Sequence, residues 1–276
     1  MSDGAPTPDL PAHVPSSEGG LQLLELVKVM ARLRGPGGCP WDAEQTHASL
    51  ARHLLEETHE ALAAIDDGDR DALRDELGDV LLQVVFHAQI AADEGAWDVD
   101  DVARRLIDKL IRRHPHVFGE VEVAGADEVL VNWEQIKAEE RGRGADLEDD
   151  IPASLPALAR ASKVQRRAAG FGFDWRTREA ALAKLREEVD ELEAAAPGAD
   201  AEAELGDVLF AAAAVARRLD VDPESALRRT TSTFARRYEA MRARAAAEGV
   251  QLDALDDDAL LGYFRASREQ PERGSP

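Results

Sequence analysis

The sequence predicts an all-α protein, with two tandem units of four to five helices forming helical bundles that are completed by dimerisation. Apolar residues recur with a period near 3.6 over most of the chain. Alanine and leucine are abundant and aromatic residues make up only 5%, which favours helices over strands. Apolar residues make up 44% of the 276 positions, enough for a core, yet each unit alone is short of apolar surface.

In the first half of the chain, the apolar spacing predicts five helices, over residues 23–33, 50–65, 73–85, 102–111 and about 126–141. Glycine and proline at 35–38 stop the first helix, and the turn at 66–69 ends the second. The fourth helix should end before Pro115, because the residue that precedes a proline disfavours the helical region. A glycine-containing stretch at 142–146 is a candidate flexible linker.

The composition of the ends completes the expected organisation. Proline and small polar residues dominate the start of the chain, and the last residues are similar, so both ends are expected to be disordered. The expected parts are a leader over 1–18, a helical domain over 19–141, a linker over 142–155, a second helical domain over 156–269 and a tail over 270–276.

The second half of the chain repeats motifs of the first half. The motif E-E-x-x-E occurs at 56–60 and again at 187–191, and the motif E-L-G-D-V-L occurs at 76–81 and again at 204–209. The repeats follow their counterparts by 131 and 128 residues, respectively. A nearly constant offset indicates an internal duplication.

The composition excludes several classes of protein. The formal net charge of −22 repels phosphate backbones and anionic lipids, so neither a nucleic-acid partner nor a membrane is expected. Cys39 is the single cysteine, which excludes a disulfide framework and a cysteine-rich zinc site. No run of roughly 18 apolar residues and no signal peptide is present, so a cytoplasmic protein is expected. So acidic a chain would bind a phosphate substrate only through cations, which points to a metal.

Four carboxylates are expected to meet between two helices of the first unit. Glu57 and Glu60 are three residues apart and point from one helix face, and Glu76 and Asp79 repeat this spacing on the next helix. The short loop between the helices favours antiparallel packing. Like charges this close destabilise one another unless a cation lies among them. Hard oxygen ligands suit magnesium or manganese, with open positions for water and phosphates.

A glycine accompanies each acidic motif. Glycine within a helix costs about 1 kcal/mol relative to alanine, so Gly78 and Gly206 are expected to permit close helix approach or substrate access. The competing interpretation is a solvated acidic face, which is common in a chain with 55 acidic residues. Because both motifs recur together within one helix-loop-helix, the metal site is favoured.

The pattern E-E-x-x-E followed by E-x-x-D resembles the MazG-type nucleoside triphosphate pyrophosphohydrolases, within the all-α NTP pyrophosphatase group. Four further segments are similar to segments of this family: 38–42, 112–118, 133–137 and 172–175. The resemblance spans about residues 21–269. It implies two MazG-like domains in homodimeric helical bundles, Mg²⁺ as the cofactor, and nucleoside triphosphates cleaved between the α- and β-phosphates to a monophosphate and pyrophosphate.

The resemblance also implies the site residues. The expected metal ligands are Glu57, Glu60, Glu76 and Asp79 in the first unit, and Glu188, Glu191, Glu204 and Asp207 in the second. The expected catalytic residues are Glu56, Glu57, Glu187 and Glu188, of which Glu56 and Glu187 would hold or deprotonate the attacking water. In the first unit, the expected substrate-binding residues are Lys109, Arg113, Trp133 and Lys137, with the cations on phosphates and the indole against a base.

The second unit departs from the family pattern. Thr233 stands where the family has a lysine four residues before an arginine, here Arg237. Phe264 and Arg268 stand in place of a tryptophan and a lysine. The hypothesis is therefore that both units bind metal and that the first carries the fuller set of substrate contacts.

Two other functions stay open. Glu56 and His59 have the spacing of a di-iron helical bundle, but Asp190 replaces the histidine in the second unit. A non-catalytic helical protein that binds nucleotides or a partner is the other alternative. The complete acid set in both halves argues against it, because a pure scaffold would be more stable with fewer converging charges. Family members are often permissive, so broad base specificity and nucleotide-pool housecleaning are expected.

Overall fold

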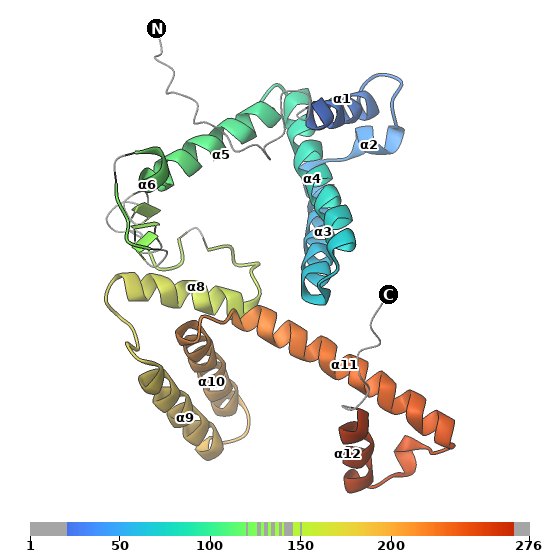
Figure 1. The fold of residues 1–276 in the computed structure, drawn as a ribbon, viewed down its shortest axis with the longest axis vertical. Coiled ribbons are helices and arrows are strands. Elements are labelled where there is room, and N and C mark those ends of the chain that lie inside the picture. Colours follow the sequence, from blue (N-terminus) through green and yellow to red (C-terminus); the bar gives the residue numbers. More distant parts are fainter. Residues whose placement is uncertain are drawn as a thin grey trace. The chain divides into compact units, whose positions relative to one another are not determined.

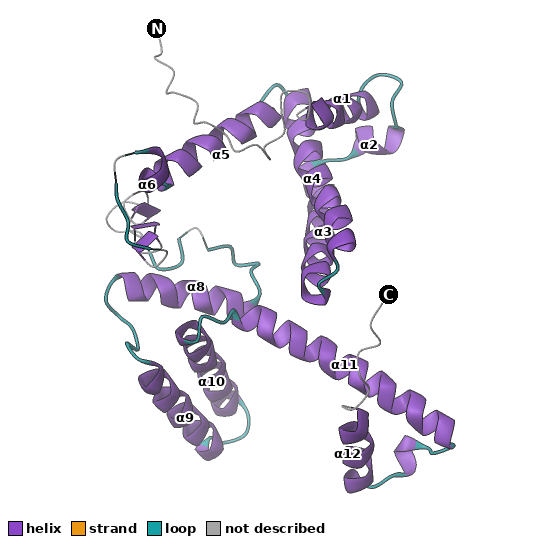
Figure 2. Cartoon of the chain, viewed as in Figure 1, coloured by secondary structure: helices purple, strands orange, loops and turns teal. Residues whose placement is uncertain are grey.

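The computed structural model describes residues 21–119, 121–125, 128–129, 132–133, 136–137, 140, 146–149 and 151–267. Within these residues the regular structure is helical and contains no strand, as Figure 2 shows, so the all-α prediction is confirmed. The chain divides after Val129 into two compact units, which are called unit 1 and unit 2 below. The five domain limits expected from the sequence stay a prediction.

Unit 1 is organised around a long antiparallel helix pair, α3 and α4 (Figure 1). Gly68 ends α3 with a left-handed φ of 70°, and the Asp69 side chain caps α4 by accepting from Asp71 and Ala72. The helices of this unit are α1 (Leu21–Arg34), α2 (Pro40–Glu44), α3 (His47–Asp67), α4 (Arg70–Asp93), α5 (Val99–Arg113) and α6 (Pro115–Phe118). Four of them match the expected helices, whereas the short α2 and α6 were not expected.

The core of unit 1 lies at one end of the α3–α4 pair. Leu50 from the first turn of α3 packs with Met30 of α1 and with Val85, Phe86 and Ile90 of α4, all at most 3% exposed. These side chains come from the apolar faces predicted by the helical period. The opposite end of the pair carries the acidic motifs.

Two further features of unit 1 follow from local sequence. Asp98 and Asp101 form a reciprocal capping box at the start of α5. As expected, this helix ends at Arg113, ahead of Pro115, which opens α6. Leu106, Ile107 and Ile111 of α5 stay 44–53% exposed, so its apolar side is largely uncovered in the single chain.

Unit 2 is built around a second antiparallel pair, α9 and α10, packed on α8. Its helices are α8 (Ala157–Gly170), α9 (Arg178–Ala194), α10 (Ala199–Arg218), α11 (Pro223–Glu248), a 3-10 turn (Leu252–Ala254) and α12 (Asp257–Ala266). The core is rich in alanine: Ala181, Ala211, Ala213 and Ala214 are at most 2% exposed. The α12 helix packs on α11 (Figure 1). Phe264 of α12 contacts Phe234, near the middle of α11.

Some expectations fall on residues that lie outside the described part of the chain. These are the leader over 1–18, the tail over 270–276, Arg268 and most of the helix expected over 126–141. Within the described residues, no helix combines the length and the apolar character needed to cross a membrane.

Candidate metal and catalytic centre

The acidic residues of unit 1 converge as expected from their spacing. Carboxylate oxygens of Glu57 on α3 and of Glu76 and Asp79 on α4 lie within 4.8 Å of one another. Glu60, one turn after Glu57, is outside this group of three, but it lies close enough to raise the pKa of Glu76. The antiparallel pairing of α3 and α4 thus brings together three of the four acids expected in this unit.

Crowding changes the protonation of this cluster. Burial raises the pKa of Glu57, and the charges of Asp79, Glu60 and Glu76 raise it further. Burial likewise raises the pKa of Glu76, with Glu60 and Asp79 adding to the effect. Among the described residues, none of these four acids has an ion pair with a basic side chain. The cluster therefore carries uncompensated negative charge, which a cation would relieve.

Unit 2 contains a second cluster of the same kind. Carboxylate oxygens of Glu188 and Glu191 on α9 and of Glu204 on α10 lie within 4.8 Å of one another. Asp207 is outside this group of three, so the structure brings together three of the four acids expected here. Glu188 is the most enclosed of the acids, because the residue is only 7% exposed.

A lysine distinguishes the second cluster. The ammonium group of Lys184, one turn before the acids on α9, lies 2.8 Å from Glu188 Oε1 and 2.6 Å from Glu187 Oε1. The hydrogen bond from Lys184 lowers the pKa of Glu188. The hydrogen bond that Glu191 shares with Glu188, followed by burial, raises the pKa of Glu191. Unit 2 thus supplies part of its own countercharge.

The glycines of the two acidic motifs occupy open positions. A Cβ atom added at Gly78 or Gly206 would meet nothing within 4 Å, and both residues are exposed. Close helix approach, one of the two roles expected of these glycines, is therefore wrong for packing within the chain. Substrate access remains as their expected role.

The donor atoms of both clusters fit a hard divalent cation. Each cluster offers carboxylate oxygens alone, from two helices that are fixed against each other, and such ligands are those that magnesium and manganese prefer. Lys184 is a positive group already seated between two carboxylates of unit 2. Its place indicates that positive charge is accommodated at this level of the helix pair.

Four of the expected substrate-binding residues form two cation–aromatic pairs. The Lys137 ammonium lies 5.7 Å from the centre of the Trp133 ring. In unit 2, the Arg237 guanidinium lies 3.9 Å from the Phe264 ring and donates to the Phe264 carbonyl at 2.9 Å. Within the described residues, no hydrogen bond or ion pair joins Lys109 or Arg237 to the acidic clusters.

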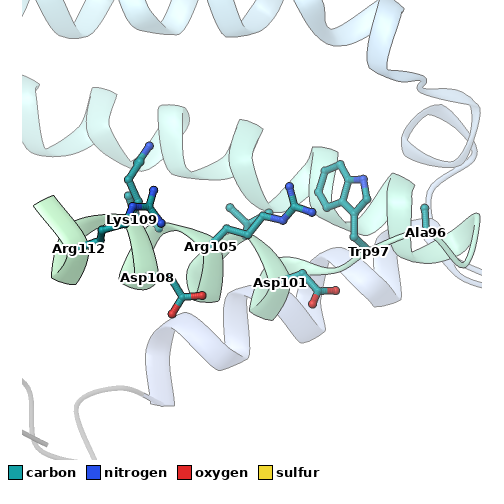
Figure 3. A pocket seen from close by; sticks show the side chains of 9 residues that line it. Ala96, Trp97, Asp101, Arg105, Asp108, Lys109 and Arg112 are labelled. Atoms are coloured by element: carbon teal, nitrogen blue, oxygen red, sulfur yellow. The ribbon is translucent and has the colours of Figure 1, made fainter. Parts of the chain in front are cut away.

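An open hollow lies along α5 beside Lys109 (Figure 3). Arg105 extends from the helix toward Trp97, and Lys109 and Arg112 line the hollow farther along α5. Trp97 stacks on His47, which in turn stacks on His87 with a 2.7 Å contact between their Nδ1 atoms. Sequence reasoning missed this ring stack, because its three members come from three separate elements.

The segment 172–175 of the family resemblance has a structural role here. Asp174 pairs with both Arg217 and Arg218 at the end of α10, and the three side chains are at most 25% exposed. These ion pairs fix the loop between α8 and α9 to the α10 helix.

Fold and site together define an all-α protein with a carboxylate cluster on each of two helix pairs. Residues 45–118, which include the first cluster, match the family model of the MazG nucleotide pyrophosphohydrolase domain. The chain is 47% identical over 257 residues to a nucleoside triphosphate pyrophosphohydrolase of Escherichia coli, covering 90% of this chain and 98% of that protein.

Further relatives agree. The nucleoside triphosphate pyrophosphohydrolase/pyrophosphatase MazG of Thermotoga maritima is 43% identical over 252 residues, covering 91% of this chain and 97% of that protein. A nucleoside triphosphate pyrophosphohydrolase of Mycolicibacterium smegmatis is 45% identical over 164 residues, covering 58% of this chain and 49% of that protein. This chain belongs to the MazG nucleotide pyrophosphohydrolase family.

Proposed function

We propose that this chain hydrolyses nucleoside triphosphates between the α- and β-phosphates, releasing a nucleoside monophosphate and pyrophosphate, with Mg²⁺ as its metal and Mn²⁺ as a substitute. The observation that carries the proposal is the carboxylate cluster of each helix pair, in a chain of this family. An all-oxygen donor set supports magnesium rather than a soft transition metal.

The acids are assigned by unit. The metal ligands are Glu57, Glu60, Glu76 and Asp79 in unit 1, and Glu188, Glu191, Glu204 and Asp207 in unit 2. When bound, Mg²⁺ supplies a Lewis acid that neutralises phosphate charge and lowers the pKa of water. In the reaction, a bond forms between the water oxygen and the α-phosphorus while the bond from that phosphorus to the bridging oxygen breaks. Pyrophosphate leaves with the bridging oxygen.

Glu56 and Glu187 are proposed to orient the attacking water and to take its proton. Each is adjacent to a proposed ligand and is held by the residue one turn earlier on its helix. His53 Nδ1 lies 3.2 Å from Glu56 Oε2, and Lys184 Nζ lies 2.6 Å from Glu187 Oε1. Both carboxylates are about 60% exposed, so one oxygen stays open to a water molecule.

The cationic and aromatic residues are proposed to bind the substrate. Lys109 and Arg113 of unit 1 would contact phosphates, as would Lys137, which follows the boundary at Val129 in the chain, and Trp133 would pack on a base. Arg237, Phe264 and Arg268 would form the smaller set of unit 2. A second copy of the chain is proposed to complete the site, because the resemblance to MazG-type proteins implies homodimeric bundles.

A homodimer is proposed for a second reason, which is the exposed apolar surface beside the acids. Leu55 and Leu77 flank the unit 1 acids and are 60% and 53% exposed, and Leu205 beside the unit 2 acids is 49% exposed. Apolar side chains this open, next to charged ones, are typical of surfaces that a partner covers. Light scattering is expected to give twice the 30.0 kDa mass of one chain, and a monomeric mass would refute the dimer.

Broad base specificity, a housecleaning role and a cytoplasmic location complete the proposal. The net charge of −22 supports the absence of a nucleic-acid or membrane partner. The test is incubation with a panel of ribo- and deoxyribonucleoside triphosphates, with and without Mg²⁺, followed by product identification. Monophosphate and pyrophosphate only with metal are expected. Diphosphate and orthophosphate would refute the bond assignment, and no turnover would refute the enzyme.

The contribution of each unit can be measured with single variants. Glu57→Gln and Glu188→Gln each remove one proposed ligand charge, and the double variant is expected to lose about 100-fold or more of its turnover. Because the expected N-terminal domain, over 19–141, carries the fuller set of proposed substrate contacts, Glu57→Gln is expected to cause the larger loss. An unchanged rate in Glu57→Gln would refute the expectation that this variant loses more turnover than Glu188→Gln.

A further inference from the structure

The two acidic clusters differ in the residue that stands one turn before them. Lys184 in unit 2 precedes Glu188 by four residues, and His53 precedes Glu57 by four residues in unit 1. The offset of 131 residues that relates the acidic motifs also relates His53 to Lys184. The position is therefore equivalent in the two helix pairs, but its chemistry differs.

The contacts of this residue differ as well. The Lys184 ammonium touches both Glu187 and Glu188, at 2.6 and 2.8 Å, and the Glu188 side chain is only 9% exposed. The His53 ring contacts Glu56, at 3.2 Å, and carries charge only when protonated. Among the described residues, no ion pair reaches Glu57, Glu60, Glu76 or Asp79. Unit 2 thus holds a permanent cation against a proposed ligand, and unit 1 does not.

We propose that Lys184 is an internal counter-ion that weakens divalent-metal binding by unit 2, so that unit 1 is the tighter of the two metal sites. The inference rests on the metal use proposed above. A dication bound to Glu188 must either displace the Lys184 ammonium or remain close to it. Either way the like charges oppose metal binding, and removal of one charge at contact distance is expected to tighten the site by about tenfold.

A purely structural role for Lys184 is the alternative. Lysine and glutamate four residues apart on a helix stabilise it by a few tenths of a kcal/mol. Loss of such a pair would lower the melting temperature slightly without changing the affinity for a metal. Metal binding without substrate therefore separates the two roles, and it needs no turnover as a readout.

The experiment is a Mn²⁺ titration of the full-length protein, in which electron paramagnetic resonance counts the free ion. The wild-type protein is expected to show two classes of site, and Lys184→Met is expected to tighten the weaker class by about tenfold. Lys184→Arg keeps the charge and is expected to retain the weak class. The reciprocal variant, His53→Lys, is expected to weaken the tighter class.

Lys28→Met is the matched control. Lys28 is an exposed lysine that pairs with Glu25, at 2.8 Å, three residues away on α1. Its loss changes the net charge as much as Lys184→Met but is expected to leave both affinities unchanged. Equal tightening in the two variants would assign the effect to overall charge and overturn the inference.

The remaining outcomes distinguish this inference from the proposed function. If Mn²⁺ binds in two classes and Lys184→Met alters neither, the counter-ion role is overturned while the metal site stands. If Mn²⁺ binds to neither unit of the wild-type protein, the metal use fails, and the counter-ion role fails with it.

Discussion

Replacing Gly78 or Gly206 with alanine is expected to stabilise the protein and to impair it as an enzyme. Each glycine lies within a helix, two residues after one acid and one residue before the next, and an added Cβ would meet nothing within 4 Å. Alanine is favoured over glycine in a helix by about 1 kcal/mol. For units of this size, that gain corresponds to a rise in melting temperature of roughly 3 °C.

The same methyl group would project into open space on the exposed surface of α4 or α10, next to Asp79 or Asp207 in the chain. If the glycines leave room for substrate, the double variant Gly78→Ala, Gly206→Ala is expected to lose about tenfold or more of its turnover while its melting temperature rises. Gly262 in α12 offers a matched control, because it also lies within a helix with no atom within 4 Å of an added Cβ. Gly262→Ala is expected to gain about as much stability as one of the two substitutions and to keep full activity.

Calorimetry and a hydrolysis assay on the wild-type protein, the double variant and Gly262→Ala test this prediction. A lower melting temperature in the double variant would mean that another copy of the chain fills the space beside the glycines. That result would refute the expected gain in stability, which rests on the open space in one chain. Full activity in the double variant would refute the substrate-access role. Equal losses of activity in the double variant and in Gly262→Ala would show that the effect is not local to the acids.

Two further predictions concern stability. Burial and the neighbouring His47 lower the pKa of His87 below its ordinary 6.5, so the unfolded chain takes up the proton first and stability falls as the pH drops below about 6.5. His87→Gln should flatten this decline in urea titrations from pH 7.5 to 5, and an unchanged slope would contradict the assignment. Asp174→Asn should cost about 2 kcal/mol, because it leaves Arg217 and Arg218 half-buried without their shared carboxylate. Chemical denaturation measures this loss, and an unaltered midpoint would mean that the ion pairs are solvated.

Helical periodicity predicted the long helices well, because their apolar faces bury the core. Leu50 and Val85, assigned to apolar helix faces from spacing alone, are each 1% exposed. The helix at Pro40–Glu44 was not predicted, because five residues are too few for a period to be visible. Spacing also predicted the convergence of the acids, since i and i+3 positions share a helix face. The short turn between the two helices then places the second helix antiparallel beside the first.

The contacts that periodicity could not predict are those between distant side chains. Asp207 has the same motif position as Asp79, yet only Asp79 joins its group of three carboxylates, because side-chain placement depends on neighbours as well as on register. The ring stack of His47, His87 and Trp97 likewise needs the tertiary arrangement. Lys184 was within reach of the sequence, since a lysine three and four residues before two glutamates is a standard helical ion-pair spacing.

Small residues at the helix contacts explain why the glycines are free for another role. Ala181 on α9 and Ala211 and Ala214 on α10 are at most 2% exposed, so alanine methyl groups, not glycines, lie where these helices are buried. Gly206 faces open space, where a helix-weakening residue gains nothing from packing. A residue that costs stability and contacts nothing in its own chain is best explained by what binds beside it. Stability and activity should therefore respond in opposite directions at Gly206, whereas Ala211 should matter for stability alone.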